Sequence, residues 1–151
     1  MGGFFSIGVR LCFPGDATVM LEDGSKKGMS AVRLGERVLV AKEDGTFGFD
    51  TVYGFLHRET NRRASYRQIH LGEDSPTVIT LSENHMIHRV TSQGGIEIVP
   101  AGEVTINDSL IAVQYDPVSN AVINSPAPVI AIHNVEKEGI YAPLPFSGTI
   151  F

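Results

Sequence analysis

The sequence contains a single cysteine, Cys12, among its 151 residues, so no disulfide can form within the chain. No apolar run approaches the roughly 18–20 residues that a membrane-spanning helix requires. Lysine and arginine total 12 against 17 aspartates and glutamates, which gives a net charge of −5. No basic stripe occurs, and the sequence thus lacks the electrostatic pattern of a protein that binds nucleic acid or an anionic membrane.

The first eleven residues carry no signal peptide that we recognise. Their apolar stretch, FFSIGV, is too short and lacks a basic flank. We interpret residues 1–11 as the remnant of a preceding segment or as an engineered leader, and residues 12–151 as one folded domain. Hydrophobic residues make up 42% of the sequence and charged residues 19%, which is typical of a globular domain.

Short runs with strand character, separated by turn residues, predict an all-β domain. No segment of roughly 10–12 residues has a helical period with caps, and MSAVRLG at 29–35 indicates at most a single 3₁₀ turn. Asp23-Gly24 and Asp44-Gly45 are dipeptides that favour tight hairpin turns. The expected strands are 17–21, 37–41, 50–59, 65–71, 76–81, 85–90, 96–100, 109–115, 128–135 and 139–144.

The second half of the sequence is similar to the first. VRLGERVLVAKEDG at 32–45 aligns with VTINDSLIAVQYDP at 104–117, and each places an acidic residue, Glu36 or Asp108, just before an apolar strand. VYGFLHRE at 52–59 similarly aligns with VIAIHNVE at 129–136. We interpret this internal similarity as a duplicated β unit with pseudo-two-fold symmetry and one shared core. The alternative is that strand-rich sequences look alike by composition.

Cys12 is the first candidate for chemistry. A lone cysteine is often a small buried hydrophobe without reactivity. A nucleophilic thiol needs a nearby base or cation and a fixed geometry, and Cys12 stands at the head of the first expected strand, next to Phe13 and the Pro14-Gly15 turn. Both interpretations are open from the residues alone.

Two histidines are candidate partners of the thiol. A polar turn, Ser82-Glu83-Asn84, follows the run TVITL and presents His85, so that a hydroxyl and an imidazole can share one small site. His57 follows an expected strand and could act as a general base or lie on the surface. A Zn²⁺ site with Cys12 and His85 is a further option, although no spacing in the sequence resembles a structural zinc site.

These pieces together resemble the Hint domains, the self-processing modules of Hedgehog proteins and inteins. The resemblance rests on the leading Cys12, on LGERVL at 34–39 against the pattern L-x-x-G-D-x-V-L, and on the S-x-x-H turn at 82–85. GIYAPLPFSGTI at 139–150 is similar to a segment typical of Hedgehog rather than intein sequences. The resemblance covers Cys12 to Phe151 and implies the all-β, pseudo-two-fold Hint fold.

The resemblance implies a self-cleavage in two steps without a metal or another cofactor. The Cys12 sulfur attacks the carbonyl of Leu11, and the Leu11–Cys12 peptide bond becomes a thioester. His85 protonates the departing Cys12 nitrogen, and Ser82 stands where the family usually has threonine. An external nucleophile, a sterol hydroxyl in Hedgehog proteins, then releases the segment before Cys12.

His57 stands where the Hedgehog family usually has an aspartate associated with the acceptor hydroxyl. The acceptor here could therefore be a sterol, another lipid alcohol or water. The chain shows neither the downstream region that recruits sterol nor the terminal asparagine and nucleophile of a splicing intein. The alternatives are an intein-like or bacterial-type Hint domain and an inert β module that only binds partners. We expect a monomer whose substrate is its own N-terminal segment, on the secretory pathway by family resemblance.

Overall fold

The computed structural model describes residues 12–42, 46–72, 77–116, 118–119, 121–146 and 149–150. The elements are, in chain order, β1 (Thr18–Met20), β2 (Lys26–Gly28), the 3₁₀ turn η1 (Met29–Ala31), β3 (Arg37–Ala41), β4 (Phe47–Leu71), β5 (Thr77–Leu81), β6 (Met86–Val90), β7 (Ile96–Pro100), the 3₁₀ turn η2 (Ala101–Glu103), β8 (Ser109–Asp116), β9 (Ala121–Pro145) and β10 (Thr149–Ile150). Among these elements no helix is long and apolar enough to cross a membrane. The expected all-β fold is confirmed.

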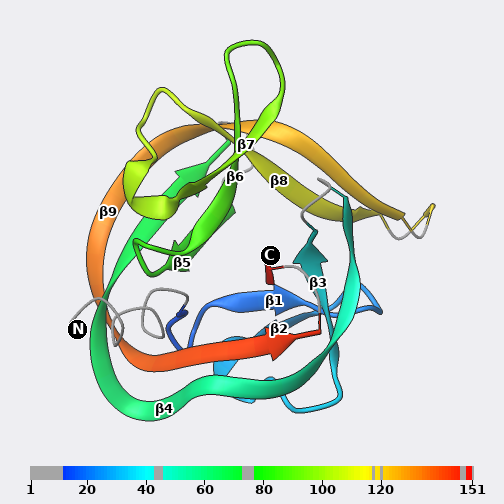
Figure 1. Cartoon of the computed structure of the whole chain (residues 1–151), viewed down its shortest axis with the longest axis vertical. Helices are drawn as coiled ribbons and strands as arrows, with labels where there is room; N and C mark the ends of the chain where they lie inside the picture. Colours follow the sequence, from blue (N-terminus) through cyan, green and yellow to red (C-terminus); the bar gives the residue numbers. More distant parts are fainter. Residues whose placement is uncertain are drawn as a thin grey trace.

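Two long antiparallel strands, β4 and β9, run through both halves of the molecule. They pair with each other along most of their length, and they continue into one sheet in the order β10-β3-β4-β9-β8-β6-β7, with β5 also paired to β4. A separate hairpin pairs β1 with β2. Figure 1 shows β4 and β9 curving around the outside, with β1 and β2 on one side and β5 to β8 on the other.

The two long strands correct the sequence prediction, which divided each of them in two. The expected strands at 50–59 and 65–71 are parts of the 25-residue β4, and those at 128–135 and 139–144 are parts of the 25-residue β9. The linking residues of β4, 60–64, contain no glycine or proline that would break a strand. Four shifts of the β4–β9 register absorb the curvature instead, because a bulge bends a strand without ending it.

Local hydrogen bonds reveal the pseudo-two-fold repeat. Glu36 accepts the backbone N–H of Arg33 at 2.9 Å, and Asp108 accepts that of Thr105 at 2.9 Å. Next to these turns, β4 and β9 donate equivalent bonds, from Val52 N–H to the Glu36 carbonyl and from Val129 N–H to the Asp108 carbonyl, both at 2.9 Å. Each acidic residue therefore closes the turn before its strand, and the predicted duplication is confirmed.

The repeat also relates the turn after Cys12 to the turn that presents His85. Ala17 N–H bonds the Pro14 carbonyl at 3.2 Å, and His85 N–H bonds the Ser82 carbonyl at 3.0 Å. The 3₁₀ turns then bond back in the same way, Met29 N–H to the Ala17 carbonyl at 2.7 Å and Ala101 N–H to the His85 carbonyl at 2.8 Å. Cys12 thus lies two residues before one copy of this turn, and His85 is the last residue of the other.

Each half has a core of its own, which corrects the expectation of one shared core. The first core includes Val19, Met29, Val32, Val38, Val40, Val52 and Tyr141. The second includes Ile69, Leu71, Leu81, Ile87, Val99, Ala101, Val104, Leu110 and Val129. Phe13, the residue after Cys12, packs against both cores. The backbone next to Cys12 therefore lies at the junction of the two halves.

Candidate functional site

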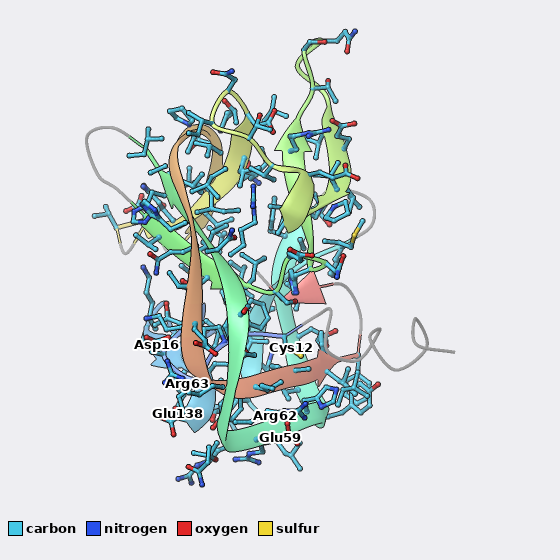
Figure 2. The ribbon with its side chains drawn as sticks, turned by 90° about the vertical axis from the view of Figure 1, so that its left-hand side faces the viewer. Cys12, Asp16, Glu59, Arg62, Arg63 and Glu138 are labelled. Carbon is cyan, nitrogen blue, oxygen red and sulfur yellow. The ribbon has the colours of Figure 1, made fainter. Side chains whose placement is uncertain are left out.

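Cys12 lies buried against the two long strands, with only 1% of its surface exposed. It packs with Tyr66 of β4 and with Ile140 and Ala142 of β9 in a third, small cluster. Figure 2 shows it beside the final part of β9, near the bend of β4 that carries Glu59 and Arg62. Leu11, the expected partner in the scissile bond, lies outside the described residues.

Ser82 contacts the backbone of Cys12 through two hydrogen bonds. The Cys12 N–H donates to Ser82 Oγ at 3.0 Å, and the Ser82 N–H donates to the Cys12 carbonyl at 2.9 Å. The hydroxyl thereby lies on the nitrogen of the peptide bond that precedes Cys12. Ser82 is buried, with 7% of its surface exposed, so the two bonds form away from bulk solvent. The structure thus brings together two residues that are 70 positions apart in the sequence.

His85 is held at the same place by its backbone and its ring. Its side chain is 3% exposed, and its ring meets the edge of Phe13 with the centroids 4.7 Å apart. Phe13 is fixed in turn, because it exchanges two backbone hydrogen bonds with Tyr141 at 2.9 and 3.0 Å. Ser82 is therefore bonded to the backbone of Cys12, and His85, on the same turn, packs against the ring of the next residue, Phe13.

Tyr66 belongs to this site although no sequence pattern singled it out. Its hydroxyl donates to the Gly139 carbonyl at 2.6 Å, and its ring lies in the cluster of Cys12. Burial, and then the negative charge that Cys12 can carry, raise the pKa of the Tyr66 phenol well above its usual value. Tyr66 is consequently a neutral hydrogen-bond donor beside the thiol over the physiological pH range.

Gly139 and Gly15 allow β9 to approach the turn that follows Cys12. Gly15 N–H bonds the Glu138 carbonyl at 3.2 Å, and Gly139 has a left-handed φ of +97°. A Cβ on Gly139 would lie 2.9 Å from the Gly15 nitrogen and 2.8 Å from the Tyr141 ring. Only a residue without a side chain fits this contact without displacement.

His57 lies on β4 opposite Ala142 of β9 and is partly exposed. Because directly opposed residues of an antiparallel pair project to the same face, His57 leaves the sheet on the side where Ala142 packs with Cys12. The structure thus places His57 on the strand next to Ala142, a residue of the Cys12 cluster. His88 of β6 is buried, and this burial lowers its pKa.

No group of three or more histidine, cysteine, aspartate or glutamate side chains in the described part of the chain is arranged to hold a metal ion. Cys12 and His85 are two donors of the kind that zinc prefers, but a closed zinc site needs four ligands.

Comparison with known proteins identifies the family. The model of the Hint module matches residues 5–151. The Tiggy-winkle hedgehog protein of Danio rerio is 29% identical over 141 residues, which cover 92% of this chain and 33% of that protein. Protein hedgehog of Drosophila virilis is 28% identical over 148 residues, which cover 94% and 28%. The chain spans about a third or less of the length of these relatives.

Solved structures carry the same fold. The DnaX mini intein from Spirulina platensis aligns with a TM-score of 0.69 at 17% identity, covering 91% of each chain. The bacterial intein-like domain from Clostridium thermocellum aligns with a TM-score of 0.62 at 16% identity, covering 89% of this chain and 86% of that one. With a family match over nearly the whole sequence and this fold, the chain belongs to the Hint module family of self-processing domains.

Proposed function

We propose that this domain cleaves the peptide bond before Cys12 by an N-to-S acyl shift and then transfers the acyl group to an external nucleophile. The observation that carries the proposal is the Ser82 hydroxyl on the Cys12 nitrogen at 3.0 Å, with His85 presented by the same turn. That nitrogen is the leaving group of the first step. An inert β module would not require a buried hydroxyl on this nitrogen.

In the first step, the Cys12 sulfur bonds to the carbonyl carbon of residue 11, and the carbon–nitrogen bond breaks. The thiol loses its proton, and the nitrogen gains one to leave as an amine. His85 acts as the general acid for that nitrogen, a role whose usual contribution is about 10²–10⁴-fold. Ser82 holds the nitrogen in place and can turn its O–H toward the lone pair that develops there.

The burial of Cys12 and the fixed contacts around it support this step. An amide is more stable than a thioester, so the site must stabilise the thioester form by fixed contacts rather than by solvent. Cys12 is held by the two hydrogen bonds of Ser82, and the Phe13 backbone beside it is held by Tyr141. This fixed geometry reduces the entropy that the attack of the sulfur would otherwise cost.

In the second step, the oxygen of an alcohol bonds to the thioester carbon, the carbon–sulfur bond breaks, and the Cys12 thiol is regenerated. His57 acts as the base that takes the hydroxyl proton, because it leaves the sheet on the face where Ala142 packs with Cys12. A sterol or another lipid alcohol is the acceptor class we favour from the Hedgehog relatives, and the same relatives support the secretory pathway as the route of this protein. Water as acceptor makes the reaction a hydrolysis.

The test is intact mass spectrometry of the domain with a reporter protein fused before residue 1. We expect dithiothreitol to release the reporter, since a thiol attacks a thioester directly. Cys12→Ala should abolish this release, and His85→Ala should slow it by about 10²-fold or more. Release from the Cys12→Ala variant at the wild-type rate would overturn the proposal.

The acceptor is identified in the same assay by adding cholesterol, a long-chain alcohol or neither. The mass added to the reporter names the nucleophile, and an unmodified reporter indicates hydrolysis. His57→Ala should slow release by an alcohol while leaving release by dithiothreitol unchanged, because a thiolate needs no base. Equal loss with both nucleophiles would assign His57 to the first step or to folding instead.

A further inference from the structure

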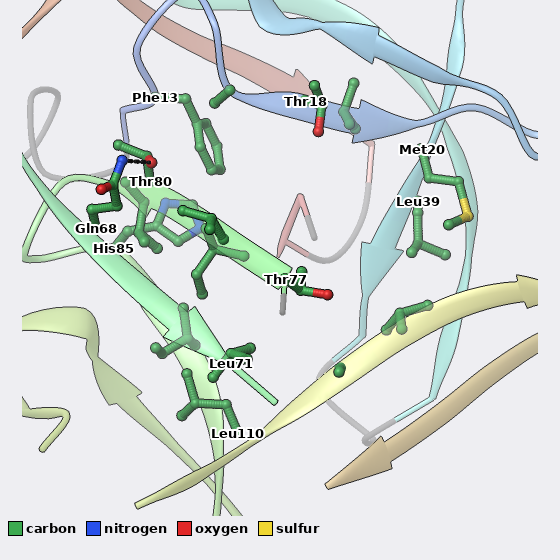
Figure 3. Close-up of a pocket in the computed structure, with 18 of the residues that line it drawn as sticks. Phe13, Thr18, Met20, Leu39, Gln68, Leu71, Thr77, Thr80, His85 and Leu110 are labelled. Atoms are coloured by element: carbon green, nitrogen blue, oxygen red, sulfur yellow. Dashed lines mark hydrogen bonds between the residues drawn. The ribbon is translucent and has the colours of Figure 1, made fainter. Parts of the chain in front are cut away.

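A cavity of about 510 Å³ lies between the two halves of the molecule. Its walls come from β1 and β3 on one side and from β5, β6 and β8 on the other, as Figure 3 shows. Phe13 and His85 form one end of it, and Cys12 is not among its lining residues. Ligand pockets in proteins commonly have volumes of about 300–1,000 Å³.

The cavity has its origin in the duplicated fold. Each half fills its own core, and Phe13 packs against both. Beyond Phe13 the two apolar surfaces face each other without closing. Its apolar wall contains buried side chains from both halves, among them Val19, Leu39, Leu71 and Leu110.

The cavity also has polar side chains on both of its walls. Thr18, Thr77 and Thr80 line it, and so do two lysines, Lys26 and Lys137. Lys137 is neutralised by Asp16 at 2.7 Å, and Asp16 is itself a lining residue. The exposed Lys26 forms no ion pair with any described residue, whereas its neighbour Lys27 binds Glu36 at 2.8 Å.

We propose that this cavity binds a long-chain carboxylate, with the hydrocarbon chain between the two cores and the carboxylate against Lys26. The apolar wall matches a methylene chain, and the charge at Lys26 distinguishes an anionic amphiphile from a neutral one. His88 also lines the cavity and is neutral there, because burial lowers its pKa, so it adds no charge beside the chain. His85 forms one end of this cavity, but binding of the carboxylate does not depend on the proposed cleavage.

The test is calorimetric titration of the Cys12→Ala variant with dodecanoate below its micelle concentration. We expect saturable binding of one molecule per chain. Decanoate should bind roughly 16-fold more weakly, since each buried methylene contributes about a factor of four. Methyl dodecanoate should bind about two- to fivefold more weakly, which is the range for loss of an exposed ion pair.

Three further variants locate the binding. Lys26→Glu should weaken it by at least the same factor as the methyl ester, while Lys42→Glu, an equal charge change away from the cavity, should not. Ala112→Phe fills the cavity from β8 and should weaken binding tenfold or more, with circular dichroism as the check on folding. If Ala112→Phe does not fold, the lysine pair and the chain-length series decide.

Absence of saturable binding would overturn the proposal. So would an affinity independent of chain length, or equal losses in Lys26→Glu and Lys42→Glu. None of these outcomes depends on cleavage, because the titrated protein lacks the nucleophile. Failure of the proposed function and failure of this inference are therefore distinguishable.

Discussion

At the scale of single residues, Ser82 gives the most direct prediction. Ser82→Ala removes the acceptor of the buried Cys12 N–H, which should lower the free energy of unfolding by about 1–3 kcal/mol. The same variant should slow thiol-induced release of an N-terminal reporter. Ser82→Thr keeps the hydroxyl and should preserve both properties within a few-fold. Urea unfolding and the release assay measure them, and a Ser82→Ala protein with wild-type stability would contradict the hydrogen bond.

His88 gives a prediction on pH at the same scale. Burial lowers its folded-state pKa below 6.5, so the unfolded chain binds a proton more readily than the folded one. The contribution of His88 to stability is thus complete above pH 6.5 and is lost as the pH falls below it. His88→Leu should show a smaller loss of unfolding free energy than the wild type between about pH 6.5 and 5. Equal pH slopes in urea titrations of the two proteins would contradict this prediction.

At the scale of the elements, two glycines with similar positive φ angles distinguish the cost of a strained backbone from the cost of a close contact. Gly35 has φ +88° and nothing within 4 Å of a Cβ, whereas Gly139 of β9 has φ +97° and the Gly15 nitrogen at 2.9 Å. Gly35→Ala should cost about 1–2 kcal/mol for the left-handed backbone alone. Gly139→Ala should cost clearly more, roughly 3 kcal/mol or above, because β9 must also move away from the turn after Cys12.

Urea unfolding of the two alanine variants measures the difference. Equal losses of unfolding free energy would show that β9 can move at Gly139 at little cost. In that case the contact between β9 and the Cys12 turn would not be rigid, and the fixed geometry proposed for the acyl shift would lose its support. The Gly139→Ala variant should also release the reporter more slowly, whereas Gly35→Ala should not.

At the scale of the whole molecule, two cores are joined by two shared strands. β4 contributes Val52 to the first core and Ile69 to the second, and β9 contributes Tyr141 and Val129 in the same way. Neither half can unfold without releasing both long strands. We therefore expect one cooperative transition, although two cores exist.

Truncation in either core tests this cooperativity. Met29→Ala in the first core and Leu110→Ala in the second should each lower stability by about 2–5 kcal/mol. In both variants, urea curves from far-ultraviolet circular dichroism and from tyrosine fluorescence should coincide. A variant in which the two probes give different midpoints would show that the halves unfold separately.

The sequence by itself determined the features that depend on near neighbours. Period-two patterning and turn residues predict the strands, and the Asp23-Gly24 turn is confirmed by Gly24, which has φ +86° and donates to the Leu21 carbonyl at 2.9 Å. The repeat of Glu36 and Asp108 predicts the duplication for the same reason, since each side chain closes its own turn. The S-x-x-H pattern likewise predicts a hydroxyl and an imidazole on one turn.

Only the tertiary structure decided which residues meet Cys12. Ser82 lies 70 positions from Cys12 in the sequence, and its hydroxyl binds the Cys12 nitrogen because the pairing of β4 with β9 brings distant segments together. Tyr66 and Gly139 have no local signal, since their roles depend on packing between strands. The continuous β4 and β9, and the cavity between two separate cores, also follow from bulges and long-range pairing. Local preferences act over a few residues, whereas the assembly of the site depends on contacts between the two halves.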